Sequence, residues 1–382
     1  MQYNLFYTVL DNSAFLHAKD LLACLKFNYL ESSILSSALL PENNTGFSLT
    51  LKEDQTLASS QRIELCDKPI CRLRKGQVLV KMLASPVNPS DLVYLLGKYG
   101  LAPNDGAYVG FEGCGIVIDA NAGFYGKWLV GKRVAVSAQP GIDGVWAKYA
   151  VTKANFCLPV RKSLSDEQAA TIIVNPCTSV CMVERAKSLN AKAIVINAAA
   201  SQVGKGVIRY AKMLGIKTVA TVRSKSNVEI LQQLGADCVL LTTSDDFEEK
   251  LKLACKELKA TVLLDSVAAE DTPNLLKAMP NNSTAIVYGR LTETFDPVGG
   301  LFSVADVIFR NIKIEGFWLA KYIGDANPWQ VISLSRKVQK LFEQGVFHTD
   351  IYASVNFDDF PKALDHYAKH KSDGKVILKP HD

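Results

Sequence analysis

Apolar residues in the second half of the chain form short continuous runs that alternate with segments of helical spacing. Such runs are typical of buried strands in a parallel sheet, and the segments between them are typical of helices that cover its faces. The expected strands are residues 193–197, 218–222, 238–241, 261–265, 285–288 and 313–317, and the expected helices are residues 202–214, 227–234, 244–258 and 272–279. This alternation predicts an α/β domain with a doubly wound parallel sheet.

The stretch from residue 46 to residue 159 has a different pattern, in which glycine and proline separate short apolar runs. Many short strands at close spacing indicate a compact, barrel-like β domain. The expected strands are residues 78–83, 113–118, 128–136 and 145–151, with turns at 131–132 and 140–141. A last strand, residues 374–379, is predicted to return to this domain.

A helix-start signal marks the boundary between the two patterns. Ser165 can cap a helix, and Gln168 follows at the spacing of a capping box. Residues 169–187 are expected to be helical, with a break at Asn175 and Pro176, because proline lacks the N–H that a helix interior needs.

The first 45 residues form a separate segment. Apolar positions between residues 15 and 29 fall near helical spacing, and residues 11–13 could cap such a helix; a disordered extension is the alternative. The chain is therefore expected to consist of an N-terminal extension, a β domain and an α/β domain. Their expected bounds are residues 1–45, residues 46–160 with 345–382, and residues 161–344.

Composition narrows the classes of function. The net charge is only +5 on 382 residues. The sequence also contains no basic run of the kind that binds nucleic acid or anionic lipid. The nine cysteines include no CxxC pair, which argues against a disulfide framework and a four-cysteine zinc site and favours a reducing compartment. No run of about 18 apolar residues occurs, so no membrane span is expected.

The expected location is the cytoplasm. A mitochondrial presequence would be rich in arginine and poor in acidic residues. Residues 1–45 instead contain no arginine, two lysines and four acidic residues. A mitochondrial location stays open as the alternative, without a convincing presequence to support it.

The turn after the strand at 193–197 carries a reduced form of the dinucleotide motif GxGxxG. Only Gly204 is present, where glycine lets helix and strand pack closely, and Ala199 and Ser201 occupy the other two positions. Small residues still let a pyrophosphate approach the free N–H groups at the start of the following helix. The residues assigned to this cofactor site are Ser201, Gln202, Val203 and Gly204.

The end of the second strand indicates which dinucleotide binds. An NAD-binding unit usually places an acidic residue there to hold the ribose 2′-hydroxyl. This strand ends instead in Arg223, Ser224 and Lys225, and the two basic side chains can pair with a 2′-phosphate that a carboxylate would repel. The alternative is that they are solvated loop charges. The sequence therefore predicts NADPH as the cofactor.

Several short motifs outside this turn point to a family. They are residues 88–91 (NPSD), 97–100 (GKYG), 110–113 (GFEG), 131–135 (GKRVA), 175–178 (NPCT), 198–204 (AAASQVG), 234–237 (LGAD) and 372–380 (SDGKVILKP). Together they resemble the medium-chain dehydrogenase/reductase superfamily over roughly residues 47–380. The resemblance implies a Rossmann-type doubly wound parallel sheet plus a GroES-like β-barrel catalytic domain.

The resemblance also bears on metal chemistry. The zinc alcohol dehydrogenases of this superfamily hold a catalytic metal with an early cysteine and with the histidine of a Gly-His-Glu motif. The matching stretches here read Val87-Asn88-Pro89 and Gly110-Phe111-Glu112, and phenylalanine cannot ligate zinc. The structural zinc lobe is also missing, so no metal is expected.

Two zinc-independent branches compete for the function. The mitochondrial-type trans-2-enoyl thioester reductases look closest, and NADPH:quinone oxidoreductases are the alternative. A non-catalytic NADPH-binding protein is the alternative from another class. The sequence departs from the enoyl reductases at two places. Ala200 and Gln202 are unusual in the cofactor turn, and Arg290 is unusual after Tyr288 and Gly289. The substrate therefore stays open among an enoyl thioester, an enone and a quinone.

Resemblance to the enoyl reductases implies a conjugate reduction with Tyr99 as the proton donor. A phenol has a reference pKa of about 10 and is protonated at neutral pH. Its alternative role is to pack a loop with the hydroxyl in solvent. Asn88 could donate to the substrate or the nicotinamide ribose, or could be a turn residue before Pro89.

The remaining assignments also follow from the resemblance. Asn175 and Thr178 are expected on the nicotinamide side, and Trp318 in the pocket or cofactor channel or, alternatively, in the core. Cys177 and Cys181, one helical turn apart, are interpreted as small buried residues rather than a redox pair. Residues 285–289 and 301–310 match the dimer-forming region of the family, so a homodimer is expected. Tyr288, Gly289 and Phe317 complete the expected cofactor contacts.

Overall fold

A computed structural model describes residues 40–138, 143–291 and 300–382. The expected N-terminal helix within residues 15–29 and the expected turn at 140–141 lie outside the described residues. The bounds given above for the three segments of the chain stay a prediction.

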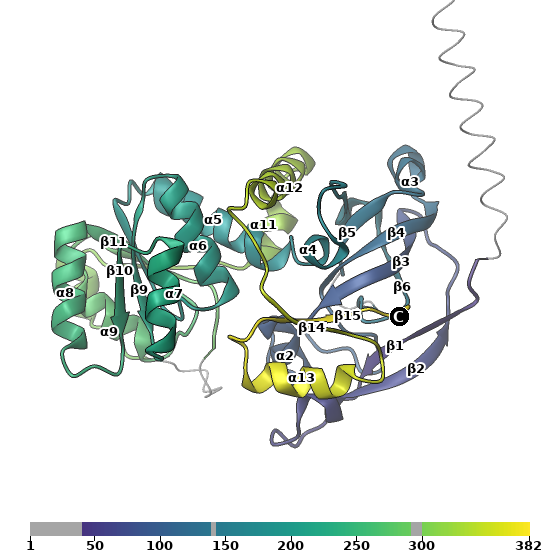
Figure 1. The fold of residues 1–382 in the computed structure, drawn as a ribbon, viewed down its shortest axis with the longest axis horizontal. Helices are drawn as coiled ribbons and strands as arrows, with labels where there is room; N and C mark the ends of the chain where they lie inside the picture. The colour runs from purple at the N-terminus through teal and green to yellow at the C-terminus, as the bar shows by residue number, and fades with distance from the viewer. Residues whose placement is uncertain (1–39, 139–142, 292–299) are drawn as a thin grey trace, which may run out of the picture. The chain divides into compact units, whose positions relative to one another are not determined.

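Six parallel strands form one sheet, in the order β10-β9-β8-β11-β12-β13 (Figure 1). Its strands are β8 (Ala193–Ile196), β9 (Lys217–Val222), β10 (Cys238–Leu241), β11 (Ala260–Asp265), β12 (Thr284–Val287) and β13 (Lys313–Gly316). The helices between them are α6 (Gln202–Met213), α7 (Ser226–Leu234), α8 (Phe247–Leu258) and α9 (Asp271–Ala278). The doubly wound α/β fold expected from the sequence is therefore confirmed, with ends that differ by three residues or fewer.

Alternate side chains of this sheet enter two different cores, as the pleat of a strand requires. Ile194 and Ile196 of β8 pack in a cluster with Val180 of α5 and Val207 of α6. Ala193 and Val195 pack on the other face, in a cluster whose helical members include Leu251, Ala254, Leu275 and Leu276 of α8 and α9. Both faces are covered, which explains why these strands read as continuous apolar runs.

The second sheet has seven strands and is mostly antiparallel. Its order is β14-β15-β3-β4-β5-β7, and β6 also pairs with β3. The strands are β3 (Gln77–Pro86), β4 (Glu112–Asn121), β5 (Arg133–Ser137), β6 (Tyr149–Lys153), β7 (Cys157–Pro159), β14 (Ile351–Val355) and β15 (Lys375–Leu378). The final strand does return, because β15 pairs with β3 across residues more than 280 positions apart, such as Ile377 and Pro86.

The remaining elements are short. Strands β1 (Asn43–Leu49) and β2 (Ile63–Pro69) form a two-stranded sheet, and 3₁₀ helices η1 and η2 cover Ser59–Arg62 and Ala154–Phe156. The other helices are α2 (Pro89–Leu95), α3 (Gly123–Leu129), α4 (Asp166–Ala170), α5 (Val174–Ser188), α10 (Val304–Phe309), α11 (Leu319–Asp325), α12 (Pro328–Glu343) and α13 (Phe360–Lys369). No helix within the described ranges has both the length and the apolar character needed to cross a membrane.

Two strand predictions are wrong at their N-terminal ends. Trp128 and Leu129 belong to α3, and the strand expected at 128–136 begins at Arg133, after Gly131 turns the chain at a φ of 77°. The strand expected at 145–151 begins at Tyr149. In both cases a local apolar run extends past the residues that pair in the sheet.

The helix break also lies elsewhere than expected. Helix α4 ends at Ala170 and α5 begins at Val174, so the break precedes Asn175 and Pro176. Pro176 occupies the first turn of α5, where a helix has no partner for the missing N–H. The predicted cap is confirmed, because Ser165 Oγ accepts a hydrogen bond from the Gln168 N–H at 3.2 Å.

Candidate active site

The turn between β8 and α6 has the geometry of a phosphate-binding turn. Ser201 caps α6, and its Oγ accepts a hydrogen bond from the Gly204 N–H at 3.1 Å. A Cβ on Gly204 would lie 2.5 Å from the carbonyl oxygen of Ala199, so only glycine lets the helix approach the turn this closely. The first N–H groups of a helix lack partners within it and carry the positive end of its dipole. This end of α6 can therefore receive an anion.

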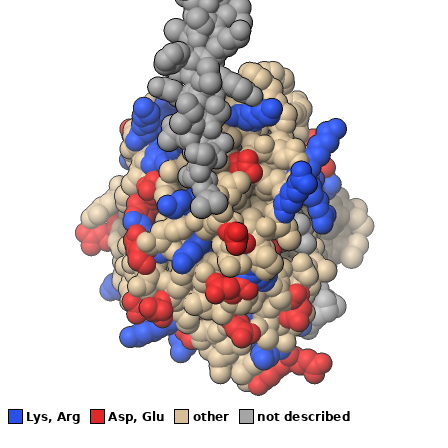
Figure 2. Space-filling view, turned by 90° about the vertical axis from the view of Figure 1, so that its right-hand side faces the viewer, with Lys and Arg blue, Asp and Glu red and all other residues tan. Residues whose placement is uncertain are grey.

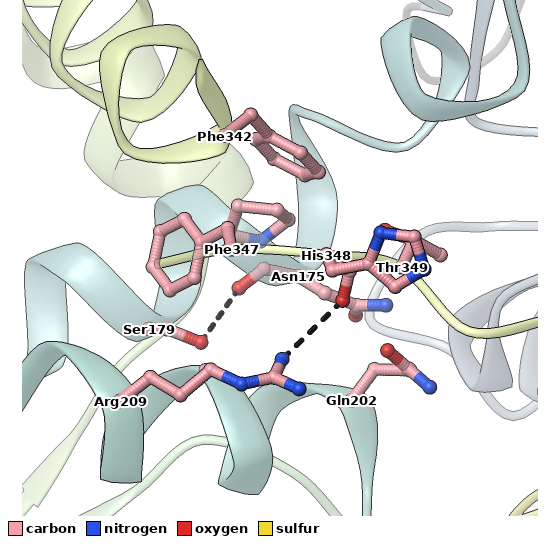
Figure 3. A pocket seen from close by; sticks show the side chains of 10 residues that line it. Asn175, Ser179, Gln202, Arg209, Phe342, Phe347, His348 and Thr349 are labelled. Atoms are coloured by element: carbon pink, nitrogen blue, oxygen red, sulfur yellow. Dashed lines mark hydrogen bonds between the residues drawn. The ribbon is translucent and has the colours of Figure 1, made fainter. Parts of the chain in front are cut away.

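A small pocket lies beside the start of α6, between this helix and α5 (Figure 3). Asn175 and Gln202, both expected at the cofactor, line it together with Arg209. Gln202 Nε2 donates to Asp350 Oδ2 at 3.2 Å, and Lys205 Nζ lies 2.6 Å from the same oxygen. Burial raises the pKa of the Asp350 carboxyl, but Lys205 and Gln202 lower it by more, so that it stays ionised. Sequence reasoning missed Asp350.

The basic end of β9 lies next to the phosphate-binding turn. The Ala199 N–H donates to the Thr221 carbonyl at 3.2 Å, which connects the turn to the last residues of β9. Arg223, Ser224 and Lys225 follow directly and are exposed. The structure thus brings the two parts of the predicted dinucleotide site to one edge of the sheet, where ligands of such folds bind.

Tyr99 lies in an aromatic cluster with Phe111 and Trp318. Its ring is 5.3 Å from the Phe111 ring and 6.0 Å from the Trp318 ring, measured between centroids. Trp318 Nε1 donates a hydrogen bond to Tyr99 Oη at 2.9 Å. Because this bond uses a lone pair of the phenol oxygen, the phenol proton stays available to another acceptor.

The surroundings of Tyr99 keep its phenol protonated. Burial raises its pKa above the ordinary value, the hydrogen bond from Trp318 lowers it in part, and the carboxyl of Asp91 raises it again. The side chain is half-buried, whereas Trp318 is 37% exposed. The alternative of Trp318 as a core residue is therefore wrong, since much of its ring is open to solvent.

Asn88 is the centre of a buried polar cluster and is fully buried. Its Nδ2 donates to Glu112 Oε1 at 2.9 Å, and its Oδ1 accepts from Lys375 Nζ. Asn175 Nδ2 is a further donor to Asn88 Oδ1, at 3.5 Å. The expected role of Asn88 as a donor to the substrate stays a prediction, and these contacts already use one of its two N–H groups.

Glu112 connects this cluster to helix α5. Its Oε2 accepts hydrogen bonds from the N–H groups of Ile173 and Val174, at 3.1 and 2.9 Å. A carboxylate at a helix N-terminus satisfies free donors and favours the helix dipole. Asn175 and Thr178, the residues expected on the nicotinamide side, lie in the first and second turns of this helix. Glu112 therefore fixes the end of α5 that carries them.

Lys375 compensates the buried carboxyls. Its Nζ donates to the Val87 carbonyl at 2.8 Å as well as to Asn88, and the side chain is almost fully buried. Burial lowers the pKa of Lys375, and burial raises the pKa values of Asp91 and Glu112. The nearby opposite charges act against these shifts in each case. Sequence reasoning missed the role of Glu112 and Lys375, although both lie in motifs that indicated the family.

The other expected contacts lie near the same edge of the sheet. Thr178 Oγ donates to the Val174 carbonyl at 2.6 Å, so this hydroxyl can only accept from a ligand. A Cβ on Gly289 would lie 2.9 Å from the Ser266 carbonyl oxygen, which requires a glycine there. Tyr288 and Phe317 pack against the core cluster, and the Phe317 N–H donates to the Val287 carbonyl at 2.9 Å.

Two cysteines of α5 and Phe111 bear on the chemistry expected in this region. Cys177 and Cys181 are free and buried, as predicted, and burial raises the pKa of both thiols. Phe111, at the position of the zinc-ligating histidine in the resembling dehydrogenases, packs against Tyr94 and Tyr99. Across the described ranges, no three His, Cys, Asp or Glu side chains gather in a way that could hold a metal ion.

Comparison with known proteins adds two family models. Residues 74–162 match the model described as an alcohol dehydrogenase GroES-like domain, and residues 203–366 match the one described as a zinc-binding dehydrogenase. The position expected to ligate zinc lies in the first of these ranges, and in this chain it is Phe111.

Relatives and solved structures match over most of the chain. The mitochondrial enoyl-[acyl-carrier-protein] reductase of Rattus norvegicus is 31% identical over 326 residues, which are 83% of this chain and 84% of that protein. The structure of a "putative NADPH:quinone reductase" from Mesorhizobium loti has a TM-score of 0.82 at 30% identity and covers 89% of this chain and 99% of that one. The Etr1p/NADP/crotonyl-CoA complex has a TM-score of 0.73 at 22% identity, covers 88% of this chain and 99% of that one, and supports the fold.

Proposed function

This chain belongs to the zinc-independent medium-chain dehydrogenase/reductase superfamily, and we propose that it reduces the C=C bond of a trans-2-enoyl thioester. It is an oxidoreductase of the enoyl reductase or quinone reductase type, and its cofactor is NADP(H). The single observation that supports the finer proposal is the hydrogen bond from Trp318 Nε1 to Tyr99 Oη, which orients a protonated phenol.

The proposed reaction is a conjugate reduction. NADPH, when bound, supplies the hydride that reaches the β-carbon of the substrate, and negative charge then develops on the thioester oxygen. Tyr99 donates its phenol proton to the α-carbon of the enolate, and the phenolate that is left takes up a proton from solvent before the next turnover. Trp318 donates a hydrogen bond to the phenol oxygen and orients it. The buried carboxyl of Asp91 raises the pKa of the phenol, which keeps Tyr99 protonated until the proton is transferred.

The cofactor is held by the residues at the edge of the six-stranded sheet. The free N–H groups of Gln202 and Val203 would hold the pyrophosphate, and Arg223 and Lys225 would pair with the 2′-phosphate. Asn175 and Thr178 contact the nicotinamide side. Two observations support this arrangement: the close approach at Gly204 and the exposure of the basic side chains beside the turn.

NADPH:quinone reduction is the second candidate. It is favoured by the fold match to the Mesorhizobium loti protein at 30% identity. A two-electron reduction of a quinone would use the same hydride site, but the one hydride and the one proton would provide the hydrogens of the two hydroquinone oxygens, and no carbon atom would be protonated. A non-catalytic NADPH-binding protein would bind the cofactor and turn over none of these substrates.

Isotope transfer distinguishes these candidates. NADPH that carries deuterium at C4, supplied with crotonyl-CoA and the purified chain, is expected to give butyryl-CoA with one deuterium on the β-carbon. Mass spectrometry of the product locates the label. The enoyl thioester proposal would be contradicted if crotonyl-CoA were recovered unreduced and unlabelled while the same protein reduced a quinone.

Arg223→Ala is expected to raise KM for NADPH by about tenfold to 100-fold, because a charge-assisted hydrogen bond contributes about 1.5–3 kcal/mol. KM for NADH, which lacks the 2′-phosphate, is expected to stay within about twofold. Lys217→Ala is the control, since Lys217 begins the same strand at its opposite end and pairs with Asp237. Equal effects on both cofactors would refute the assignment.

A homodimer is proposed from the free edge of the six-stranded sheet. Strand β13 is an edge strand, and the neighbouring α10 region exposes apolar side chains, among them Leu301 at 87% and Phe309 at 80%. Contiguous apolar surface of this kind marks an interaction site. Light scattering is expected to give twice the chain mass of 41.8 kDa, and Phe309→Asp is expected to lower it toward one chain. A monomeric wild-type chain would contradict the proposal.

The location is open between two compartments. Enoyl-[acyl-carrier-protein] reductases of the curated relatives are named as mitochondrial, so a mitochondrial location fits this chain. The cytoplasmic location expected from the sequence stays a prediction.

A further inference from the structure

Helix α3 exposes aromatic side chains far in sequence from every residue assigned to the reaction. Phe124 is 89% exposed and Trp128 is 47% exposed. Tyr125 stacks on Trp128 with ring centroids 5.8 Å apart, and Tyr125 Oη donates to the Cys157 carbonyl at 2.9 Å. These contacts fix the helix on the sheet and leave the Phe124 ring with no role in the core.

The opposite side of α3 explains why it lies flat on the sheet. Gly126 and Leu129 are buried, and a Cβ on Gly126 would lie 2.4 Å from the Ala122 Cβ. Gly126 and Leu129 therefore face the sheet, and Phe124 and Trp128 face solvent. Exposed aromatic residues that do not serve the core are typical of binding surfaces.

Backbone hydrogen bonds join the residues just before α3 to two other segments that carry basic residues. The Gly76 N–H donates to the Asn121 carbonyl at 2.7 Å, and the Ala154 N–H donates to the Gly76 carbonyl at 2.9 Å. The turn at 74–76 and the start of η2 thus lie beside the residues just before α3. The basic residues of 74–76, 121–132 and 153–156 are Arg74, Lys75, Lys127, Lys132 and Lys153.

Acidic residues are nearly lacking from the same segments. Asp119 is the only acidic residue within residues 71–77, 119–133 and 153–157. Arg133, at the end of the second of these ranges, pairs with Asp166 at 2.7 Å. Figure 2 shows basic and acidic side chains interspersed over the face that it draws. We name the surface formed by Phe124, Trp128 and the five basic residues the α3 face.

We propose that the α3 face docks this enzyme on an anionic lipid membrane. Tryptophan and tyrosine favour the headgroup region of a bilayer, and an exposed phenylalanine can enter the acyl boundary. Lysine and arginine next to such anchors attract anionic lipids, and each changes the affinity by about fivefold. Lys132 Nζ lies 4.5 Å from the Trp128 ring centroid, so charge and aromatic anchor act at the same point.

No basic run in the sequence predicts this surface, because its charges come from segments that only the fold brings together. The charge pattern favours lipid over a second copy of the chain, since two copies of the α3 face would bring like charges together. The inference is independent of the proposed substrate and concerns where the enzyme resides.

Vesicle sedimentation with the full chain tests the proposal. The wild-type chain is expected to sediment with phosphatidylcholine vesicles that contain phosphatidylserine, much less with pure phosphatidylcholine, and less as salt increases. The double variant Phe124→Ser/Lys127→Glu is expected to bind at least tenfold more weakly. Both positions are exposed, so the unfolding midpoint is expected to stay unchanged.

Matched variants away from the α3 face serve as controls. Trp329→Ser removes a tryptophan that is 79% exposed on α12, and Lys252→Glu reverses an exposed charge on α8. Both are expected to bind vesicles like the wild type. The proposal is overturned if the wild-type chain ignores anionic vesicles, if the controls lose as much binding as the double variant, or if the double variant instead converts a dimer to a monomer.

Discussion

Tyr99→Phe is expected to lower kcat for NADPH oxidation with 2-hexenoyl-CoA by about 100-fold to 10,000-fold, the range that a positioned proton donor contributes. The substitution removes the phenol oxygen and keeps the ring that packs on Phe111. KM for NADPH is expected to change little, because Arg223 and the turn at Ser201 are in a different part of the site. Steady-state rates at saturating NADPH measure the effect.

The same assignment predicts a pH dependence. Tyr99 acts as an acid only while protonated, and burial raises its pKa above the ordinary value of about 10. The rate is therefore expected to stay level through neutral pH and to fall only above the ordinary tyrosine range. A fall that begins near pH 7 would point to a different donor.

Trp318→Phe is the matched control for Tyr99. It keeps an aromatic ring and removes the Nε1 donor that holds Tyr99 Oη. The expected loss in kcat is smaller, about tenfold, because the phenol proton is still present but less well oriented. If Trp318→Phe and Tyr99→Phe lower the rate equally, Tyr99 has no chemical role of its own.

Lys375→Met is expected to lower the free energy of unfolding by about 3–5 kcal/mol, the usual result of removing one partner from a buried group of charges. The variant leaves Asp91 and Glu112 without the cation that compensates them, and leaves Asn88 Oδ1 and the Val87 carbonyl without the Lys375 donor. Chemical denaturation of both proteins measures the difference.

The loss is expected to depend on pH in a defined direction. Burial holds the pKa values of Asp91 and Glu112 above those of the unfolded chain, so ionisation of these groups destabilises the fold as pH rises. Without Lys375 this penalty grows, and the destabilisation is expected to be larger at pH 8 than at pH 5. Adding Glu112→Gln to Lys375→Met is expected to restore part of the stability. A loss that is independent of both pH and Glu112 would contradict this account.

Much of the fold is readable from the sequence, because buried parallel strands are apolar on both faces. Residues 193–197 and 238–241 therefore appear as strands within one residue of their bounds. The strand start predicted at Trp128 is wrong because Trp128 is an exposed residue of α3 and Leu129 is a buried residue of the same helix. Helices α11 and α12 were not predicted, although Val331, Leu334, Val338 and Leu341 of α12 follow helical spacing.

The site was predicted less completely than the fold. Tyr99 and Trp318 were singled out separately, and their hydrogen bond spans 219 positions that no local pattern connects. The cluster of Asn88, Glu112 and Lys375 has the same origin, because its members come from the start of α2, from β4 and from β15. Long-range polar contacts depend on how the sheet folds, which residue spacing does not determine.

The most direct test of the central claim compares substrates. The purified full chain is mixed with NADPH and, in separate reactions, with crotonyl-CoA, 2-hexenoyl-CoA, an enone and a quinone, and NADPH oxidation is followed by absorbance. We predict the highest kcat/KM with the enoyl thioesters, a rate that depends on Tyr99, and weaker oxidation of NADH. Turnover of the quinone without turnover of either enoyl thioester would contradict the claim.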